Sequence, residues 1–246
     1  MLAAQALKAS RRPRITLSLA PGDPAAVTLC ELILSHDGNP LILNDPGSVA
    51  AFTFLQTLQR EGLLAPASFD AKWDTEVENL LREASSLTEN WSFTSARLAD
   101  HGQLQDFEVY EGWYGPGGRR VVGGDVLAIP ANVSGKELLA AVELTDFLMS
   151  RESQELLARR NAWPSFRSDV EYGSLPGDQQ PTFDAIRKAL ERGWYRPAVA
   201  YWPDVSDRLN EAVDAIVLDN EPVQPVLDAL HAEIRAAAER RGAAYP

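Results

Sequence analysis

Apolar residues recur at helical spacing along most of the chain, and turn residues separate one helical stretch from the next. The run AAVTLCELILSH (25–36) predicts an apolar helix that Asp23 and Pro24 cap and start. The stretch NDPGSVAAFTFLQTLQREGLLAP (44–66) predicts another, with Asp45 as its cap, Pro46 in its first turn and Gly62 at its end. Helical spacing returns over 74–85, 134–161, 181–193 and 201–242.

Short strand-like runs lie between these helices. They are RITLSL (14–19), LIL (41–43), SLTENWSF (86–93) and DVLAIP (125–130). The long helix after the last of these runs is amphipathic, with Leu138, Val142, Thr145 and Leu148 on its expected inner face. Helices that alternate with short strands are typical of a sheet covered by helices, so the pattern predicts a helix-rich α/β fold.

Composition and charge exclude several classes of partner and site. The chain has 246 residues, 23 Lys and Arg against 35 Asp and Glu, and a formal net charge of −12. Its most basic run, KASRRPR (8–14), is typical of a solvated helix end, so no nucleic-acid partner is expected. Cys30, the one cysteine, permits no internal disulfide and no cysteine-rich zinc site, and we expect it to be a buried small hydrophobe.

Neither a membrane span nor a secretory signal is predicted. No stretch reaches the roughly 18 apolar residues that a span requires. At the N-terminus the charges follow the apolar residues instead of preceding them, unlike a secretory signal. If Met1 is the native start, these features predict a cytoplasmic location.

No arrangement of residues in the sequence favours catalysis. The three histidines, His36, His101 and His231, do not have the spacing of a metal site. The Gly-x-Ser-x-Gly turn of hydrolases and the Gly-rich loop that binds phosphates are both missing from the sequence. We therefore expect no enzymatic activity, no cofactor and no metal.

The tryptophans are more informative about function than the histidines or the catalytic motifs. A tryptophan in a polar loop is costly to expose, so it must either pack or bind. A pyranose has an apolar C–H face and a polar rim, so indoles beside amide, carboxylate and guanidinium groups suit sugars. The alternative is that these indoles fill the core beneath loops. The tryptophans predicted in loops or at strand ends are Trp91, Trp113, Trp163, Trp194 and Trp202.

Two adjacent glycines open the predicted strand in VVGGDVLAIPANV (121–133). Gly123 and Gly124 either allow a turn that other residues avoid or let another group approach the main chain closely. The second possibility would mark a ligand site. The pattern alone leaves both open.

Four segments, in this order, resemble a known family. They are NDPGSVAAFTFLQTLQREGLLAP (44–66), TENWSFTSARL (88–98), VVGGDVLAIPANVSGKELLAAVELTDFLMSRESQELLARRNAWPS (121–165) and RPAVAYWPDVSDRLNEAVDAIVLDNEPVQPVLDAL (196–230). The chain is similar to the C-terminal portion of the extracellular solute-binding proteins of ABC sugar importers, the maltose/trehalose-type group. Each segment is weak by itself, and their order makes the resemblance specific.

The resemblance implies an α/β, helix-rich fold with a periplasmic-binding-protein-like (class II) lobe and an incomplete second lobe. Residues 1–122 with 194–246 would form the C-terminal lobe, and 123–193 would be a remnant of the N-terminal lobe. A mono- or oligosaccharide would lie in a cleft between lobes, delivered to the permease subunits of an ABC importer. The implied ligand-binding residues are Asp23, Asn90, Trp91, Gly123, Gly124, Asp125, Arg196, Tyr201 and Trp202.

Two departures from the family matter. Asp125 stands where the family commonly has an aromatic residue after the Gly-Gly pair, which could favour a more polar or cationic ligand. The strands of the first lobe are missing, so the returning segment, about 125–192, is expected to expose apolar faces. That segment could pack differently, form a homodimer or pair with a chain that supplies the missing lobe.

These departures leave an alternative function open. In it, the chain is a degenerate half-receptor that self-associates or binds a partner and does not bind sugar. The resemblance itself implies a periplasmic or extracellular location, in contrast to the expectation from a native Met1.

Overall fold

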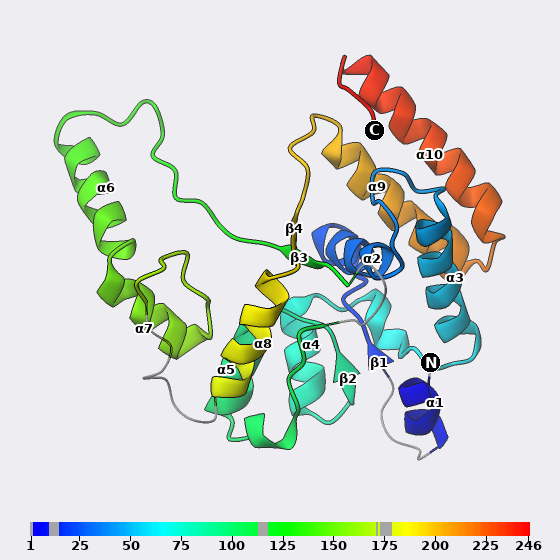
Figure 1. The fold of residues 1–246 in the computed structure, drawn as a ribbon, viewed down its shortest axis with the longest axis horizontal. Helices are drawn as coiled ribbons and strands as arrows, with labels where there is room; N and C mark the ends of the chain where they lie inside the picture. The colour runs from blue at the N-terminus through cyan, green and yellow to red at the C-terminus, as the bar shows by residue number, and fades with distance from the viewer. Residues whose placement is uncertain (1, 10–14, 113–117, 171, 173–178) are drawn as a thin grey trace. The chain divides into compact units, whose positions relative to one another are not determined.

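The protein is described by a computed structural model that covers residues 2–9, 15–112, 118–170, 172 and 179–246 (Figure 1). Contacts divide the chain into two compact units. Unit 1 comprises 1–90, 112–122 and 189–246, and unit 2 comprises 91–111 and 123–188. The boundary at 122/123 coincides with the one expected between the lobes, whereas 91–111 groups with unit 2 and 189–193 with unit 1. The assignment of these units to lobes stays a prediction.

Unit 1 combines helices with short strands. The strands form parallel pairs, β1 with β2 and β3 with β4. Its elements are α1 (Leu2–Ala9), β1 (Ile15–Thr16), α2 (Asp23–Ser35), α3 (Pro46–Arg60), a 3-10 turn (Pro66–Phe69), α4 (Trp73–Leu81), β2 (Leu87–Thr88), β3 (Arg120–Val122), β4 (Gly193–Tyr195), α9 (Trp202–Ala212), a π-helical stretch η4 (Val213–Leu218) and α10 (Val223–Arg240).

Helix ends in unit 1 follow the sequence signals closely. The Asp45 side chain accepts a hydrogen bond from the Ser48 N–H at 2.6 Å, so the predicted cap of α3 is confirmed. Gly62, with φ of +64°, adopts the left-handed conformation just after α3 ends. At α2 the prediction is off by one residue, because Gly22 is the cap and Asp23 is the first helical residue.

The strands are shorter than predicted. Of RITLSL only Ile15–Thr16 forms a strand, and of SLTENWSF only Leu87–Thr88 does. The strand predicted over 41–43 is wrong, since the Ile42 N–H donates to the Asn39 carbonyl at 2.7 Å and closes a turn. DVLAIP (125–130) is not part of a strand either. A strand requires a neighbour for its hydrogen bonds, and this segment has none among the described residues.

Helix α2 is the centre of unit 1. Every residue from Ala25 to Ser35 is buried, and α2 contacts α3, α9 and β3 (Figure 1). A helix that is apolar nearly all round belongs in a core rather than at a surface. Cys30 lies in this stretch, so its predicted burial is confirmed, and burial raises the pKa of its thiol.

One acid interrupts this apolar helix. Glu31 is buried, and its Oε1 accepts a hydrogen bond from the Val121 N–H at 2.6 Å. Its Oε2 lies 3.3 Å from Nη1 of the buried Arg120. Burial raises the pKa of Glu31 to about 7, against the opposing effects of the Val121 N–H and the Arg120 guanidinium. Gly112 makes room for this pair, because a Cβ there would lie 2.5 Å from Nε of Arg120.

Unit 2 is made of helices and extended segments. Its helical elements are α5 (Phe93–Asp100), a 3-10 turn η2 (Leu104–Asp106), α6 (Gly135–Leu148), α7 (Arg151–Asn161) and most of α8 (Gln180–Leu190). Its core is small, with Tyr172 stacked on Phe183 at a ring-centroid distance of 4.8 Å. The buried members of this core are Ala96, Ala158, Ala162 and Phe183.

Helix α6 lacks the buried inner face predicted for it. None of its residues is buried. Thr145 and Leu148 are half-buried, whereas Leu138 and Val142 are 38% and 41% exposed. The helix predicted from the sequence period is confirmed, but the described part of the chain offers it little to pack against.

We expect Glu31→Leu to lower the free energy of unfolding by about 3–5 kcal/mol, because it removes the buried carboxyl group that accepts hydrogen bonds from the Val121 N–H and the Arg120 guanidinium. Urea unfolding followed by circular dichroism measures this loss. Glu78→Leu on the surface of α4 is the matched control, since its partner Arg82 is 77% exposed in its side chain. Similar losses in the two variants would contradict a structural role for the Glu31–Arg120 pair.

The stability contributed by Glu31 should depend on pH. Because its pKa is raised from 4.5 to about 7, the folded protein keeps a proton that the unfolded chain releases at lower pH. This contribution is therefore complete below pH 4.5 and is lost as the pH rises through about 7. Relative to Glu31→Gln, the wild-type protein should lose stability between pH 5 and pH 8 in urea titrations. A difference that stays constant or grows would contradict the raised pKa.

Candidate functional site

The first part of the candidate site is the turn that leads into α2. Gly22 has a φ of +109°, a conformation that favours glycine. The Asn210 side chain of α9 holds this turn, accepting from the Gly22 N–H at 2.7 Å and donating to the Gly22 carbonyl at 3.2 Å. Asp23, which follows, is exposed at the first turn of α2. The packing of α9 against α2 therefore fixes where this carboxylate lies.

Asp23 meets a residue that follows β4. Its Oδ1 accepts from Nη1 of Arg196 at 2.5 Å, and both side chains are partly exposed. β4 lies next to β3, in the register Val121 with Trp194. Since Glu31 of α2 holds β3, the same helix determines the positions of both the Asp23 carboxylate and the Arg196 guanidinium.

Two indoles lie in the same part of unit 1. Trp194 of β4 and Trp202, the first residue of α9, have ring centroids 6.4 Å apart and planes inclined by 54°. Both are half-buried, and Tyr195 between Trp194 and Arg196 is 72% exposed. We call Asp23, Trp194, Arg196 and Trp202 the α2–β4 cluster.

Tyr201, which the resemblance implies as a ligand-binding residue, is buried inside unit 1. Its exposure is 0%, and its hydroxyl donates to the Ala244 carbonyl at 3.5 Å. Its ring lies 6.0 Å from that of Tyr245, and burial raises the pKa of its hydroxyl. The α9 N-terminus thus packs this ring into the core of unit 1, and the ligand contact expected for Tyr201 stays a prediction.

Asn90 is half-buried at the end of unit 1 that precedes Trp91. Its Nδ2 donates to the Trp73 carbonyl at 2.8 Å. This bond ties the segment after β2 to the start of α4. It gives Asn90 a structural role in addition to the ligand contact predicted from the sequence.

In unit 2 the indole of Trp91 lies against the main chain at Gly123. A Cβ placed on Gly123 would be 2.5 Å from Cη2 of Trp91 and 3.0 Å from its Cζ3. Gly124 has open space instead, with nothing within 4 Å of the corresponding position, and it and Asp125 are exposed. Neither glycine has a left-handed φ. Close approach therefore explains Gly123, and the approaching group is the half-buried Trp91 side chain of the protein itself.

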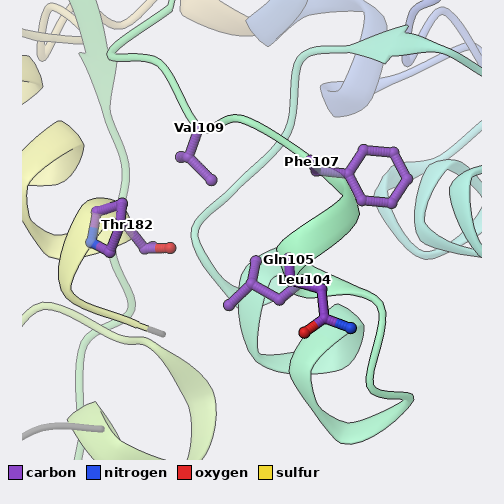
Figure 2. Close-up of a pocket in the computed structure, with 6 residues that line it drawn as sticks. Leu104, Gln105, Phe107, Val109 and Thr182 are labelled. Atoms are coloured by element: carbon purple, nitrogen blue, oxygen red, sulfur yellow. The ribbon is translucent and has the colours of Figure 1, made fainter. Parts of the chain in front are cut away.

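A separate pocket of about 220 Å³ lies in unit 2, and Figure 2 shows the residues that line it. Residues at and after η2 lie opposite the start of α8, and the lining is mainly apolar. Oγ1 of Thr182 is buried and has no hydrogen-bond partner among the described residues. No residue that the sequence predicted for ligand binding lines this pocket, so we assign it no ligand. The lining residues are Leu104, Gln105, Phe107, Val109, Pro181 and Thr182.

The sequence missed the residues that position the cluster. Asn210, Gly22 and Glu31 act through hydrogen bonds to the main chain, for which a single sequence carries little signal beyond the turn GDP before α2. Trp163 is 44% exposed, and Trp113 lies outside the described residues. Within the described ranges no group of three acidic, histidine or cysteine side chains could hold a metal, and no helix is long and apolar enough to cross a membrane.

We expect Gly123→Ala to displace the Trp91 indole, lowering the free energy of unfolding by about 1–3 kcal/mol through overpacking. Gly124→Ala is the matched control and should change it by less than about 0.5 kcal/mol, since its Cβ meets open space. Tryptophan fluorescence should shift in the first variant, and a Trp91→Phe background should remove that shift. Equal behaviour of the two alanine variants would contradict the contact.

Comparison with known proteins agrees with this architecture. The sequence profile described as bacterial extracellular solute-binding protein matches residues 2–174. The structure is similar to that of maltose-bound MalE3 of Thermotoga maritima, with a TM-score of 0.84 at 21% identity over 95% of this chain and 62% of the other. No curated protein sequence matches the chain.

Two further solved structures show the same fold. A solute-binding protein of an ABC transporter from Agrobacterium radiobacter K84, in complex with ribitol, has a TM-score of 0.78 at 20% identity over 93% of this chain and 60% of the other. UgpB from Mycobacterium tuberculosis, in complex with glycerophosphocholine, has a TM-score of 0.75 at 16% identity over 94% and 59%.

The chain thus spans about three fifths of the length of these proteins, at 59–62%. Its fold is the helix-rich, periplasmic-binding-protein-like fold expected from the sequence. Since the family profile covers well over half of the 246 residues, the chain belongs to the bacterial extracellular solute-binding proteins.

Proposed function

We propose that the chain binds a mono- or oligosaccharide as the solute-binding component of an ABC importer. The observation that carries the proposal is the α2–β4 cluster, in which a carboxylate and a guanidinium accompany two indoles at the surface of unit 1. Family membership supports a solute-binding role, and several structures with this fold have sugar or polyol ligands, maltose and ribitol among them.

The chemistry of the cluster suits a sugar. The indole faces of Trp194 and Trp202 offer apolar surface for the C–H face of a pyranose. The Asp23 carboxylate accepts hydrogen bonds and the Arg196 guanidinium donates them, and bonds to charged groups are the stronger kind. Surface ion pairs stabilise a fold by only about 0–1 kcal/mol. We therefore infer that the main role of the Asp23–Arg196 pair is to orient a hydrogen-bond acceptor and a donor for the ligand.

Unit 2 supplies a second set of candidate contacts. We include Trp91, Gly124 and Asp125 there, since the indole is half-buried and the other two residues are exposed. The carboxylate of Asp125 would favour a polar or cationic group on the ligand. A solved protein of this fold has glycerophosphocholine bound, which shows that the fold also accommodates ligands that are not sugars.

The remaining parts of the proposal follow from the family. The permease subunits of an ABC importer would be the partners, and the place of action would be outside the cytoplasmic membrane, as the family is extracellular. Solute-binding proteins are transport components, so we propose no catalytic activity for this chain.

A second candidate function is a half-receptor that associates through its surface and does not bind sugar. The exposed apolar residues of unit 2 favour it, with Val126 at 89% and Leu139 at 65% exposure. A homodimer and a chain supplying the missing lobe are the two partners that this function would use.

Calorimetric titration of the chain with maltose, trehalose, glucose and ribitol tests the proposal. We expect one of these ligands to bind, and Trp202→Ala to weaken its binding at least about tenfold, equivalent to ~1.4 kcal/mol. Arg196→Leu should weaken binding similarly, because it removes the guanidinium donor and leaves Asp23 unpaired. Trp163→Phe, at a partly exposed indole outside the predicted site, is the control.

Two results would count against sugar binding. One is the absence of heat and of fluorescence change with all four ligands. The other is equal weakening by the Trp202 and Trp163 variants, which would indicate a general loss of stability instead of a lost contact.

A further inference from the structure

The ion pair in the α2–β4 cluster joins one negative and one positive group. Asp23 supplies a carboxylate in the first turn of α2, and Arg196 supplies a guanidinium just after β4. Oδ1 of the first lies 2.5 Å from Nη1 of the second. The other two members of the cluster, Trp194 and Trp202, carry no charge. A ligand at this cluster therefore meets both signs of charge side by side.

Both members of the pair follow main chain that the fold of unit 1 holds in place. The Asn210 side chain of α9 accepts from the Gly22 N–H and donates to the Gly22 carbonyl, which fixes the residue before Asp23. β4 is paired with β3 as far as Tyr195, the residue before Arg196. Since both anchors are formed within the protein, the two charged groups are in place before a ligand arrives.

The pair has hydrogen-bonding capacity to spare on both sides. A carboxylate has several lone pairs that accept, and a guanidinium has several N–H groups that donate. The contact between Asp23 and Arg196 uses one of each, and their side chains are 49% and 36% exposed. The cluster therefore offers acceptors and donors next to each other to a bound ligand.

An uncharged hydroxyl group matches both members of such a pair. A hydroxyl has one O–H that donates and lone pairs that accept, so a sugar can donate to Asp23 and accept from Arg196 at once. A phosphate is attracted by the guanidinium and repelled by the carboxylate beside it, and an ammonium group meets the reverse. Neither charged group gains enough to offset the loss of its own hydration.

We propose that the Asp23–Arg196 pair makes the α2–β4 cluster selective for uncharged polyhydroxyl ligands, against phosphorylated and amino sugars. The inference rests on the proposed function, since it concerns the same site, and it adds the charge class of the ligand. Each charged residue cancels the preference that the other would impose. Removal of one member should therefore change which ligand is bound, as well as how tightly.

Calorimetric titration with two matched series of probes tests the inference. Glucose is compared with glucose 6-phosphate and glucosamine, and trehalose with trehalose 6-phosphate and trehalosamine, with the amines protonated. In at least one series, we expect the wild-type protein to bind the neutral sugar at least about tenfold more tightly than either charged analogue, because neither charge meets a net opposite charge.

Two substitutions should change this preference in opposite directions. Asp23→Asn leaves the guanidinium uncancelled, so the disadvantage of the phosphate should fall below about threefold while that of the amine remains. Arg196→Gln leaves the carboxylate uncancelled and should do the reverse. A loss of stability alone weakens all members of a series equally, so a merely structural role of the pair does not produce this crossed pattern.

Matched controls separate the pair from the net charge of the protein. Asp74→Asn makes the same change at an exposed acid in the first turn of α4. Arg82→Gln makes the same change at an arginine whose side chain is 77% exposed. Neither variant should alter the ratio of affinities within a series. Added salt should weaken the phosphate binding that Asp23→Asn gains, because that binding depends on an exposed charge.

Several results would overturn the inference and leave the proposed function standing. One is a wild-type protein that binds a charged analogue as tightly as the neutral sugar; if that analogue is an amine, Asp125 of unit 2 becomes the selecting group. Another is equal weakening of all three members of a series by Asp23→Asn and Arg196→Gln. A third is an equal change in the ratio in the control variants. Absence of binding by every probe, maltose and ribitol included, would overturn both.

Discussion

The buried carboxylate of Glu31 is the contact on which the arrangement of unit 1 depends. It reaches from the central helix α2 to the Val121 N–H and the Arg120 guanidinium, so it holds β3 against that helix. β4 pairs with β3, and the segment after β4 returns to α2 through the Arg196–Asp23 ion pair. One helix with an acid at each of two positions therefore fixes both strands and the charged part of the candidate site.

Unit 2 illustrates what happens when comparable segments lack neighbours. Its apolar residues have the pattern of covered elements, yet the hydrophobic cluster described for it is small, with Ala158, Ala162 and Phe183 among its buried members. The strand predicted over 125–130 stays extended and unpaired, and α6 stays exposed. The solved structures of this fold are longer than this chain, which spans about three fifths of them.

The glycine pair shows how far a local pattern can be interpreted. The sequence indicated that something approaches the main chain at Gly123 or that the backbone turns there, and it could not choose. The positions of the side chains decide for Gly123, where the Trp91 ring leaves no room for a Cβ, and against a left-handed turn at either glycine. Similarly, the aromatic-proline run 201–203 gave no sign that Tyr201 is core and Trp202 partly exposed.

The sequence by itself determined what depends on neighbouring residues: the ends of α3 at Asp45 and Gly62, the apolar character of α2 with Cys30 inside it, and, through the order of four segments, the family. Helix caps and turns depend on interactions within a few residues, so a single sequence is enough to predict them. Only the tertiary structure decided which strands find partners and which side chains of the predicted site are buried. Strand pairing, the Glu31–Arg120 contact and the burial of Tyr201 join residues far apart in sequence, and no local pattern encodes such distances.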